Sequence, residues 1–351
     1  MNEKPTLIIL TPGFPADEAD STCLPLLQSL VAELKGNYPQ LNLVILTFHY
    51  PFVKKNYKWN EAEVISFNGS NKRNFFKLPL FLSIWNKLKK IYKEENVVGV
   101  LSIWLGECAW IGKKFSKKYE LKHYCWLWGQ DARKGNKYVK RMQPSTNELI
   151  ALSNFLQSEF EKNYSFKPAH LIPPGIDAKQ FDWKNSIRDI DVLGVGSLIP
   201  LKQYHIFIEA VKELKNSFPK IKVLLCGRGP EETRLQQQIE KLDLKDNVML
   251  IGELPHHEAI QLMQRSKILL HTSSFEGFGL VCIEALYAGA QVVSFCKPMN
   301  KEIDHWHIAN SKEEMIKKAF EILNSPHSES IPVLAYNITD TTKQLMQLFG
   351  L

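Results

Sequence analysis

Short apolar runs alternate with stretches of helical periodicity along the whole chain. Many of the runs are rich in β-branched residues, as strands covered on both faces are. They cover residues 6–13, 41–48, 97–104, 123–129 and 148–153 in the first half, and 189–197, 220–229, 247–254, 266–274 and 290–295 in the second. Apolar strands separated by helices predict parallel sheets. We therefore predict an α/β protein with two Rossmann-like domains, whose parallel sheets face a central cleft, the default ligand site of such folds.

The stretch 165–181 carries prolines at 168, 173 and 174 and has no helical period, so it reads as the connection between the domains. We expect an N-terminal domain over residues 1–168 and a C-terminal domain over 169–337. A last helix, about 338–351, is expected to pack back on the first domain. The 351 residues, 44% of them hydrophobic, are enough for two cores of ordinary size.

Composition bears on the cellular location of the protein and on the state of its cysteines. The first residues lack the basic start and cleavage pattern of a signal peptide, and no apolar run is long enough to cross a bilayer, so we expect a cytoplasmic location. The six cysteines have no C-x-x-C pair and no zinc spacing, which predicts buried thiols, with no disulfide framework and no metal site.

The net charge of +7 is placed unevenly. Residues 1–170 hold 24 Lys and Arg against 15 Asp and Glu, an excess of +9. Such asymmetry fits nucleic acid, a phospholipid surface or an acidic polymer. Within residues 71–95 an amphipathic helix is predicted, with lysines around an apolar face of Phe81, Ile84, Trp85, Leu88 and Ile91. That face is expected either to rest on an anionic membrane or to pack on the first sheet.

The stretch "SSFEGFGLVCIEALYAGA" (273–290) holds two glutamates, Glu276 and Glu284. On one helix, eight residues separate two backbones by about 12 Å, farther than the carboxyl pairs of glycosidases require. Two glycines place Glu276 in a loop and Glu284 in the following helix. The N–H groups at that helix start predict an anion site, whereas carboxylates accept bonds from vicinal hydroxyls. A nucleotide sugar has this order of groups, with phosphate between two sets of hydroxyls.

This stretch closely resembles the E-x7-E signature of the retaining GT-B glycosyltransferases of family 4. The resemblance spans nearly the whole chain and is specific because its fragments keep their order and spacing. It includes residues 11–15, 151–160, 171–181, 195–211 and 223–235, and a segment from 247 that leads into the signature. The first domain would then be the acceptor side and the second would bind the nucleotide sugar.

The resemblance implies a role for each matching residue. Glu276, at the donor sugar's hydroxyls, and Lys202, which neutralises the departing diphosphate, are the expected catalytic residues. Glu284 is expected to accept the ribose hydroxyls. The remaining expected substrate-binding residues are Gly13, Asp131, Gly196, Ser197, Arg228, Gly277, Phe278, Gly279 and Leu280. The resemblance implies neither a metal nor a separate cofactor.

The chain departs from the family pattern at three places. Ser197 stands where many relatives have an arginine that shares the diphosphate with the lysine, and Arg228 is a candidate to compensate. Trp128 takes the place of a frequent histidine. The usual glycine-rich loop is absent after residues 291–303.

Each expected site residue also has a plainer interpretation. A glutamate on a helix or a lysine in a loop is ordinarily a solvated surface residue. The apolar neighbours of Glu284 and the spacing of Lys202 from Gly196 nevertheless favour a functional role for both. Asp131 is equally a candidate helix N-cap. We interpret His271 as a strand-end residue and His256 as a residue of a helix start.

The leading interpretation is a retaining, metal-independent hexosyltransferase. It would move a hexose from a nucleoside diphosphate sugar to a hydroxyl of a glycan or lipid-linked acceptor, in cell-envelope polysaccharide biosynthesis. Alternatives are a GT-B epimerase or hydrolase of nucleotide sugars, and a catalytically silent GT-B binding subunit. We expect no nucleic-acid partner, since that would leave the second domain unused. An anionic membrane surface is a further candidate partner, with the protein peripheral at the inner face.

Overall fold

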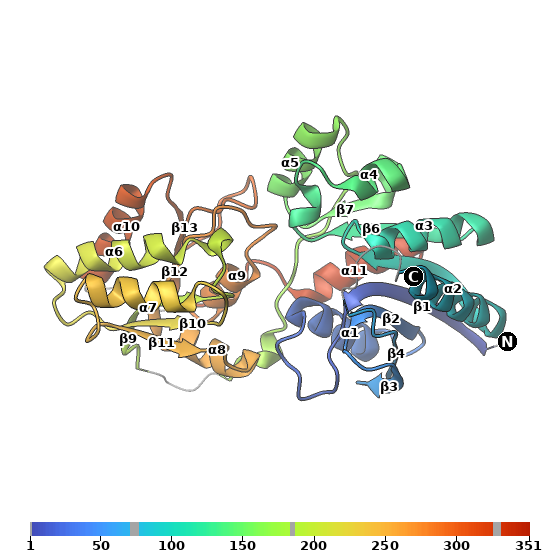
Figure 1. The fold of residues 1–351 in the computed structure, drawn as a ribbon, viewed down its shortest axis with the longest axis horizontal. Coiled ribbons are helices and arrows are strands. Elements are labelled where there is room, and N and C mark those ends of the chain that lie inside the picture. Colours follow the sequence, from blue (N-terminus) through green and yellow to red (C-terminus); the bar gives the residue numbers. More distant parts are fainter. Residues whose placement is uncertain (1, 71–76, 183–186, 326–330) are drawn as a thin grey trace. The chain divides into compact units, whose positions relative to one another are not determined.

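The chain forms two compact units, each built on its own sheet (Figure 1). The N-terminal unit comprises Met1–Gly175 and Ile338–Leu351, and the C-terminal unit comprises Ile176–Asn337. The computed structural model describes residues 2–70, 77–182, 187–325 and 331–351. Within these residues, no helix combines the length and apolar character needed to cross a membrane.

In the part of the chain that the structure describes, the sheet of the N-terminal unit has eight strands in the order β3-β4-β2-β1-β5-β6-β7-β8. They are β1 (Asn2–Gly13), β2 (Asn42–Tyr50), β3 (Lys55–Trp59), β4 (Ala62–Ser66), β5 (Glu95–Ile103), β6 (Lys122–Leu127), β7 (Leu149–Ala151) and β8 (His170–Leu171). The central strands β2, β1 and β5 are parallel. Most of β1 and β2 and the second half of β5 are buried, as their continuous apolar runs predict.

One edge of this sheet differs from the all-parallel prediction, because β3 pairs antiparallel with β4. The two strands are joined by Asn60 and Glu61, both with positive φ, as a tight hairpin turn requires. Neither position is a glycine, and β3 alternates between exposed and half-buried residues up to its last residue, the buried Trp59. The hairpin therefore lacks both the apolar run and the usual turn signal.

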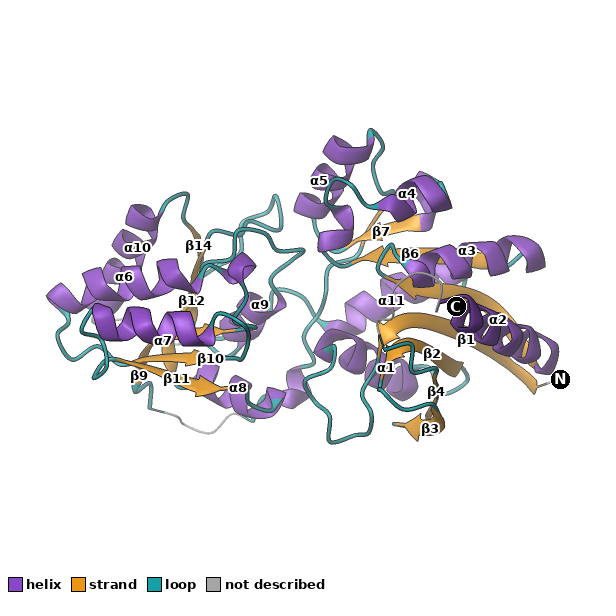
Figure 2. Ribbon diagram, in the orientation of Figure 1, coloured by secondary structure: helices purple, strands orange, loops and turns teal. Residues whose placement is uncertain are grey.

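Among the described residues, the N-terminal unit has six α-helices, and Figure 2 draws helices in purple. They are α1 (Pro25–Asn37), α2 (Lys77–Glu94), α3 (Glu107–Tyr119), α4 (Lys137–Met142), α5 (Asn154–Tyr164) and α11 (Ile338–Phe349). The apolar face of α2, with Ile84, Leu88 and Ile91, packs with α3 into the core over β1, β2 and β5. Of the two uses expected for this face, the structure shows packing on the sheet. Residues 71–76 of that expected helix lie outside the described residues.

The last helix, α11, returns to the N-terminal unit and contacts α1. Its buried residues recur at helical spacing: Ile338, Thr341, Thr342, Leu345, Met346 and Phe349. The ring of Phe349 lies so close to Gly99 in β5 that a Cβ there would stand 2.5 Å from it. The two ends of the described chain thus build one unit.

Within the described ranges 187–325 and 331–337, the sheet of the C-terminal unit has six parallel strands in the order β11-β10-β9-β12-β13-β14. They are β9 (Ile190–Val195), β10 (Val223–Cys226), β11 (Val248–Gly252), β12 (Ser266–His271), β13 (Gln291–Ser294) and β14 (Trp306–Ile308). The helices are α6 (Tyr204–Ser217), α7 (Glu232–Lys241), α8 (His256–Gln264), α9 (Leu280–Tyr287) and α10 (Lys312–Asn324).

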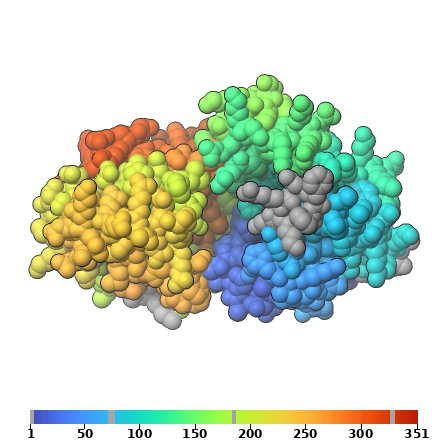
Figure 3. All heavy atoms as spheres, in the orientation of Figure 1, coloured from blue at the N-terminus to red at the C-terminus, as the bar shows by residue number. Residues whose placement is uncertain are grey.

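Helices α6, α7 and α10 share one core with alternate residues of the strands, among them Val192, Leu225 and Ile268. Helices α8 and α9 contact each other and the sheet. The outer side chains of α6 and α7 form the yellow surface in Figure 3. All six strands are parallel, so their carboxyl ends share one edge, where the loops after β9, β10 and β12 begin.

Candidate functional site

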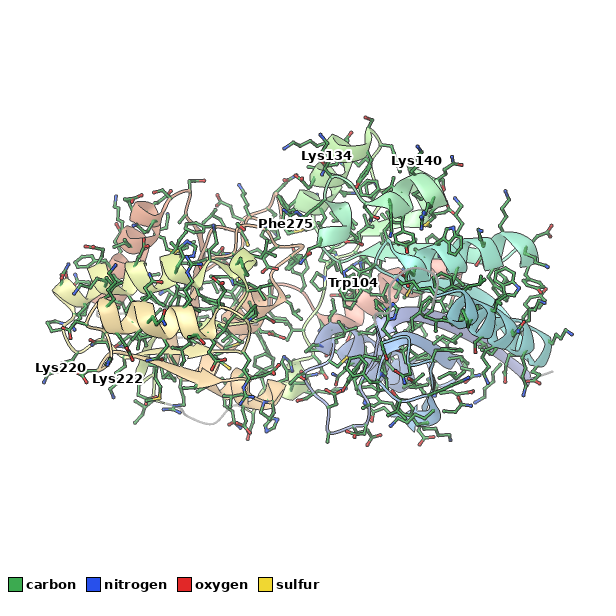
Figure 4. The ribbon with its side chains drawn as sticks, in the orientation of Figure 1. Trp104, Lys134, Lys140, Lys220, Lys222 and Phe275 are labelled. Atoms are coloured by element: carbon green, nitrogen blue, oxygen red, sulfur yellow. The ribbon has the colours of Figure 1, made fainter. Side chains whose placement is uncertain are left out.

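Two loops at the carboxyl edge of the second sheet are bonded to each other. After β9 the chain turns through the short 3₁₀ helix Pro200–Lys202, and after β12 it runs through residues 272–279 into α9. The hydroxyl of Thr272 donates to the carbonyl of Lys202 at 2.7 Å, and the N–H of Ser274 donates to the carbonyl of Leu201 at 3.0 Å. These bonds place the loop of Glu276, which also holds Phe275 (Figure 4), against Lys202.

Glu276 is held by three side chains. Lys202 forms an ion pair and hydrogen bond with its Oε1, and the hydroxyl of Ser273 donates to the same oxygen at 2.9 Å. Nε2 of His271, at the end of β12, lies 3.3 Å from that oxygen. Burial alone would raise the pKa of Glu276, but His271 and Lys202 outweigh it and lower the pKa to about 2. The carboxylate is therefore ionised at neutral pH and neutralises Lys202.

Glu284 lies inside α9, where its side chain is buried. Nε2 of His256, the first residue of α8, lies 2.8 Å from its Oε1. Burial lowers the pKa of His256, but the charge and hydrogen bond of Glu284 outweigh it and raise that pKa. The second glutamate thus also has a basic partner, supplied by a different helix.

Between the glutamates, the chain enters α9 through a turn that requires positive φ. Gly279 precedes the helix with φ +85°, a conformation that favours glycine. Phe278 is buried and packs edge-on against Trp306 and Tyr336. This packing fixes the direction of the N-terminus of α9, where helical N–H groups lack intrahelical partners.

The loops after β9 and β10 cross at glycines. Gly196 and Gly227 have φ of +143° and +149°, and a Cβ on Gly227 would lie 2.0 Å from the carbonyl oxygen of Gly196. Ser197 is exposed. Arg228 is also exposed, and its guanidinium reaches within 4 Å of the place of a Cβ on Gly252, in β11. The structure brings Gly196, Lys202 and Glu276 together, whereas the side chain of Arg228 lies beside Gly252.

The two expected site residues of the N-terminal unit lie at its own carboxyl edge. Gly13 ends β1, and a Cβ there would stand 3.4 Å from Cβ of Tyr50. Asp131 is buried and accepts bonds from the N–H groups of Leu105 (2.9 Å) and Gly129 (2.8 Å). Burial raises the pKa of Asp131 to about 6, although these bonds oppose it. Its carboxylate ties two loops together.

Aromatic and charged side chains gather at the same edge of the N-terminal unit. Trp128 packs edge-on against Trp104, which is labelled in Figure 4, with ring centres 5.1 Å apart. Glu107, at the start of α3, pairs with Lys77, lies 3.3 Å from Nε2 of His49, and accepts from the hydroxyl of Tyr138 at 3.2 Å. Burial would raise the pKa of Glu107, but His49 and Lys77 lower it to about 2.

Sequence reasoning missed the partners of both glutamates. His271 and His256 were interpreted as structural residues, yet each contacts a glutamate of the signature. It also missed Glu107, His49, Lys77 and Tyr138 as a group. The signals available were a histidine five residues before Glu276 and a histidine at a helix start, and neither identifies its partner. Among the described residues, no group of three potential ligands could hold a metal ion.

Comparison with known families identifies the C-terminal unit. Residues 176–326, nearly the whole C-terminal unit, match the family described as Glycosyl transferases group 1. The C-terminal unit is therefore a domain of this family. The family prediction is thereby confirmed, and the matched range contains the whole E-x7-E stretch with its two glutamates.

Two curated relatives and a solved structure illustrate the likeness. The phosphatidylinositol N-acetylglucosaminyltransferase gpi3 subunit of Schizosaccharomyces pombe is 27% identical over 164 residues, 45% of this chain and only 36% of that subunit. An uncharacterized glycosyltransferase of Methanocaldococcus jannaschii is 24% identical over 277 residues, 76% of this chain and 73% of that protein. HepE of Anabaena, solved with UDP-glucose, superposes with a TM-score of 0.69 at 16% identity, covering 99% of this chain and 97% of HepE. The predicted GT-B fold class is confirmed.

Proposed function

We propose that this group 1 glycosyltransferase is a retaining, metal-independent hexosyltransferase that uses a UDP-sugar. The observation that carries the proposal is the cluster of Glu276, Lys202 and His271 beside the N-terminus of α9, in the matched domain. UDP is proposed as the nucleotide because HepE was solved with UDP-glucose. The acceptor is proposed to be a hydroxyl of a glycan or lipid-linked molecule.

The geometry supports a division of labour within the C-terminal unit. The buried carboxylate of Glu284 would accept bonds from the ribose hydroxyls, and Lys202 with the N–H groups of Phe278 to Leu280 would hold the diphosphate. A diphosphate at Lys202 replaces Glu276 as the partner of that ammonium. The carboxylate of Glu276 is then free to accept bonds from the sugar hydroxyls.

In the proposed transfer, the bond between the anomeric carbon and the β-phosphate oxygen breaks while the acceptor oxygen bonds to that carbon on the same face. The acceptor proton passes to the departing diphosphate, so no protein base is required. Lys202 stabilises the charge that develops on the leaving group. The polar cluster around Glu107 in the N-terminal unit is the proposed acceptor side, where carboxylate, imidazole and phenol can bond to hydroxyls.

Thermal-shift screening against UDP, GDP and their sugars tests the donor. A ligand at 100 times its dissociation constant adds about 2.7 kcal/mol to the free energy of unfolding. Product analysis by NMR then tests the reaction, because retention of the donor's anomeric configuration is expected, as is turnover in EDTA. An inverted product or a strict metal requirement would overturn the proposal. Turnover without an acceptor would indicate an epimerase or hydrolase, and binding without turnover a silent subunit.

Substitutions test the site itself. Glu276→Gln and Glu284→Gln keep side-chain volume but remove a charge-assisted hydrogen bond worth about 1.5–3 kcal/mol, so turnover should fall roughly tenfold to a hundredfold. Glu321→Gln, an exposed change on α10, is the matched control and should retain full turnover. Wild-type turnover in both signature variants would refute the site.

We also propose that the protein works at the inner membrane face in cell-envelope polysaccharide biosynthesis. The support is the start of α2, where Leu78 and Leu82 are 63% and 55% exposed one turn apart and Lys93 is exposed further along. Co-sedimentation with anionic but not neutral vesicles is expected, with release by roughly 0.5 M salt, since each basic residue contributes about 1 kcal/mol and is screened by salt. No retention on anionic vesicles at low salt would refute this placement.

A further inference from the structure

The hydroxyl of Tyr204 is buried without a hydrogen-bond partner among the described residues. Tyr204 is the first residue of α6, only 4% exposed, and its ring packs edge-on against Phe207. Buried polar atoms in folded proteins are almost always bonded, so an orphaned hydroxyl calls for an explanation such as an absent ligand.

The orphaned hydroxyl faces the space over Gly196. A Cβ on Gly196 would stand 3.0 Å from the Tyr204 oxygen and 3.8 Å from Nζ of Lys202. One small volume, kept open by the glycine, is therefore bordered by a hydroxyl and an ammonium. Burial and the charge of Glu276 raise the pKa of Tyr204, so the hydroxyl keeps its proton and acts as a donor.

A hydroxyl donor beside a lysine suits an anion with several acceptor oxygens. Many relatives have an arginine as the second cation of the diphosphate site, but this chain has the exposed Ser197 at that position. The guanidinium of Arg228, the other candidate, lies beside Gly252. Of these candidates, Tyr204 has its polar atom beside the same space as Lys202.

We propose that the Tyr204 hydroxyl donates a hydrogen bond to the diphosphate of the donor nucleotide, beside Lys202. It would serve as the second diphosphate-binding side chain of this chain, in place of an arginine at position 197. This inference rests on the proposed function, because it needs a nucleoside diphosphate at Lys202.

A diphosphate-binding role and a structural role of the Tyr204 hydroxyl predict different effects of its removal on the stability of the free protein. Replacing Tyr204 by phenylalanine removes an unsatisfied buried hydroxyl, so the free protein should keep or raise its Tm. Affinity for UDP should nevertheless fall about tenfold to a hundredfold, the usual range for a hydrogen bond to a charged group. Uridine, which has no phosphate, should bind the variant and the wild type within about twofold of each other.

Tyr164→Phe is the matched control. The Tyr164 hydroxyl accepts from the N–H of Asn136 at 2.8 Å and donates to the carbonyl of Arg133, both in the N-terminal unit. Removing it should lower the Tm and leave the affinity for UDP unchanged. Tyr204→Phe is thus expected to lose affinity for UDP but not Tm, and Tyr164→Phe to lose Tm but not affinity for UDP.

Calorimetric titration of UDP, ligand-observed NMR of uridine and thermal melts of the free proteins decide the question. Unchanged UDP affinity in Tyr204→Phe would overturn the proposal, as would an equal loss for uridine or a Tm lowered together with affinity. If the wild-type protein binds neither UDP nor GDP, the proposed function is refuted before the role of Tyr204 is tested. If it binds GDP instead, the same comparison is made with GDP and guanosine. Nucleotide binding by the wild type without an effect of the variant refutes the role of Tyr204 alone.

Discussion

At the scale of single residues, the pairing of His256 with Glu284 makes the C-terminal unit sensitive to pH. The imidazole is positioned 2.8 Å from a buried carboxylate, and its pKa is raised above the usual value because the negative charge favours the protonated form. A histidine whose pKa is higher in the folded state stabilises the fold fully below the unfolded pKa of about 6.5. That contribution is lost as the pH rises through the folded pKa.

We therefore expect the stability difference between wild type and His256→Gln to be larger at pH 6 than at pH 8.5. Glutamine retains a hydrogen-bond donor but carries no charge, so only the titrating part of the interaction is removed. Thermal melts of both proteins in buffers of equal ionic strength measure the difference, and the other titrating groups cancel in it. A difference that is constant across this range would show that His256 does not pair as an imidazolium.

The sequence located both glutamates but could not supply their partners. The glycines around Phe278 indicated that Glu276 lies in a loop and Glu284 in a helix, which is where the structure has them. The partners come from elsewhere in the chain, Lys202 from 74 residues away and His256 from 28. No local pattern encodes such a contact, because it depends on which strands are neighbours and how their loops pack.

At the scale of elements, the crossing of the loops after β9 and β10 depends on glycine. The N–H of Gly196 donates to the carbonyl of Cys226, and that of Leu198 donates to the carbonyl of Arg228, so the two loops are bonded side by side. A Cβ on Gly227 would stand 2.0 Å from a backbone oxygen, which cannot move as a flexible side chain could. The φ of +149° adds strain for any other residue.

Gly227→Ala should therefore destabilise the C-terminal unit by about 3 kcal/mol, from overpacking and backbone strain. Gly36→Ala, in α1, is the matched control, since nothing lies within 4 Å of its Cβ position. This control should stabilise the protein by about 0.5–1 kcal/mol, because alanine is the better helix former. Denaturant unfolding of both variants tests the opposite signs. A neutral Gly227→Ala would mean that the loops do not cross as closely as described.

Strands were predictable from the sequence where their apolar runs are long, and several short strands were not. The runs at 6–13 and 97–104 correspond to central strands β1 and β5. The strands that were missed, β3, β4, β8 and β14, have five residues or fewer. Of these, β3, β8 and β14 lie at sheet edges, where burial imposes little pattern on the residues.

At the scale of the whole molecule, the N-terminal unit is completed by the other end of the chain. An apolar stripe on residues 338–349 predicts a helix that packs back on the first domain, but its partner is not local, so the sequence alone could not identify the residues that it covers. In the structure Phe349 rests on Gly99, and its ring meets that of Tyr124 edge-on with centres 5.1 Å apart. The absence of a side chain at position 99 is what admits the ring.

Phe349→Ala should accordingly destabilise the N-terminal unit by about 3–5 kcal/mol, the usual cost of deleting a buried aromatic ring. Phe349 is 4% exposed, whereas Leu351, two residues on, is 38% exposed, so Leu351→Ala should cost no more than about 0.5 kcal/mol. Amide hydrogen exchange distinguishes a local effect from a general one. Protection should fall in β5 and β6, which hold Gly99 and Tyr124, and stay unchanged in β9 and β10 of the C-terminal unit. Equal losses in both sheets would mean that the units do not unfold separately, and no loss in β5 would mean that α11 does not stabilise the sheet it covers.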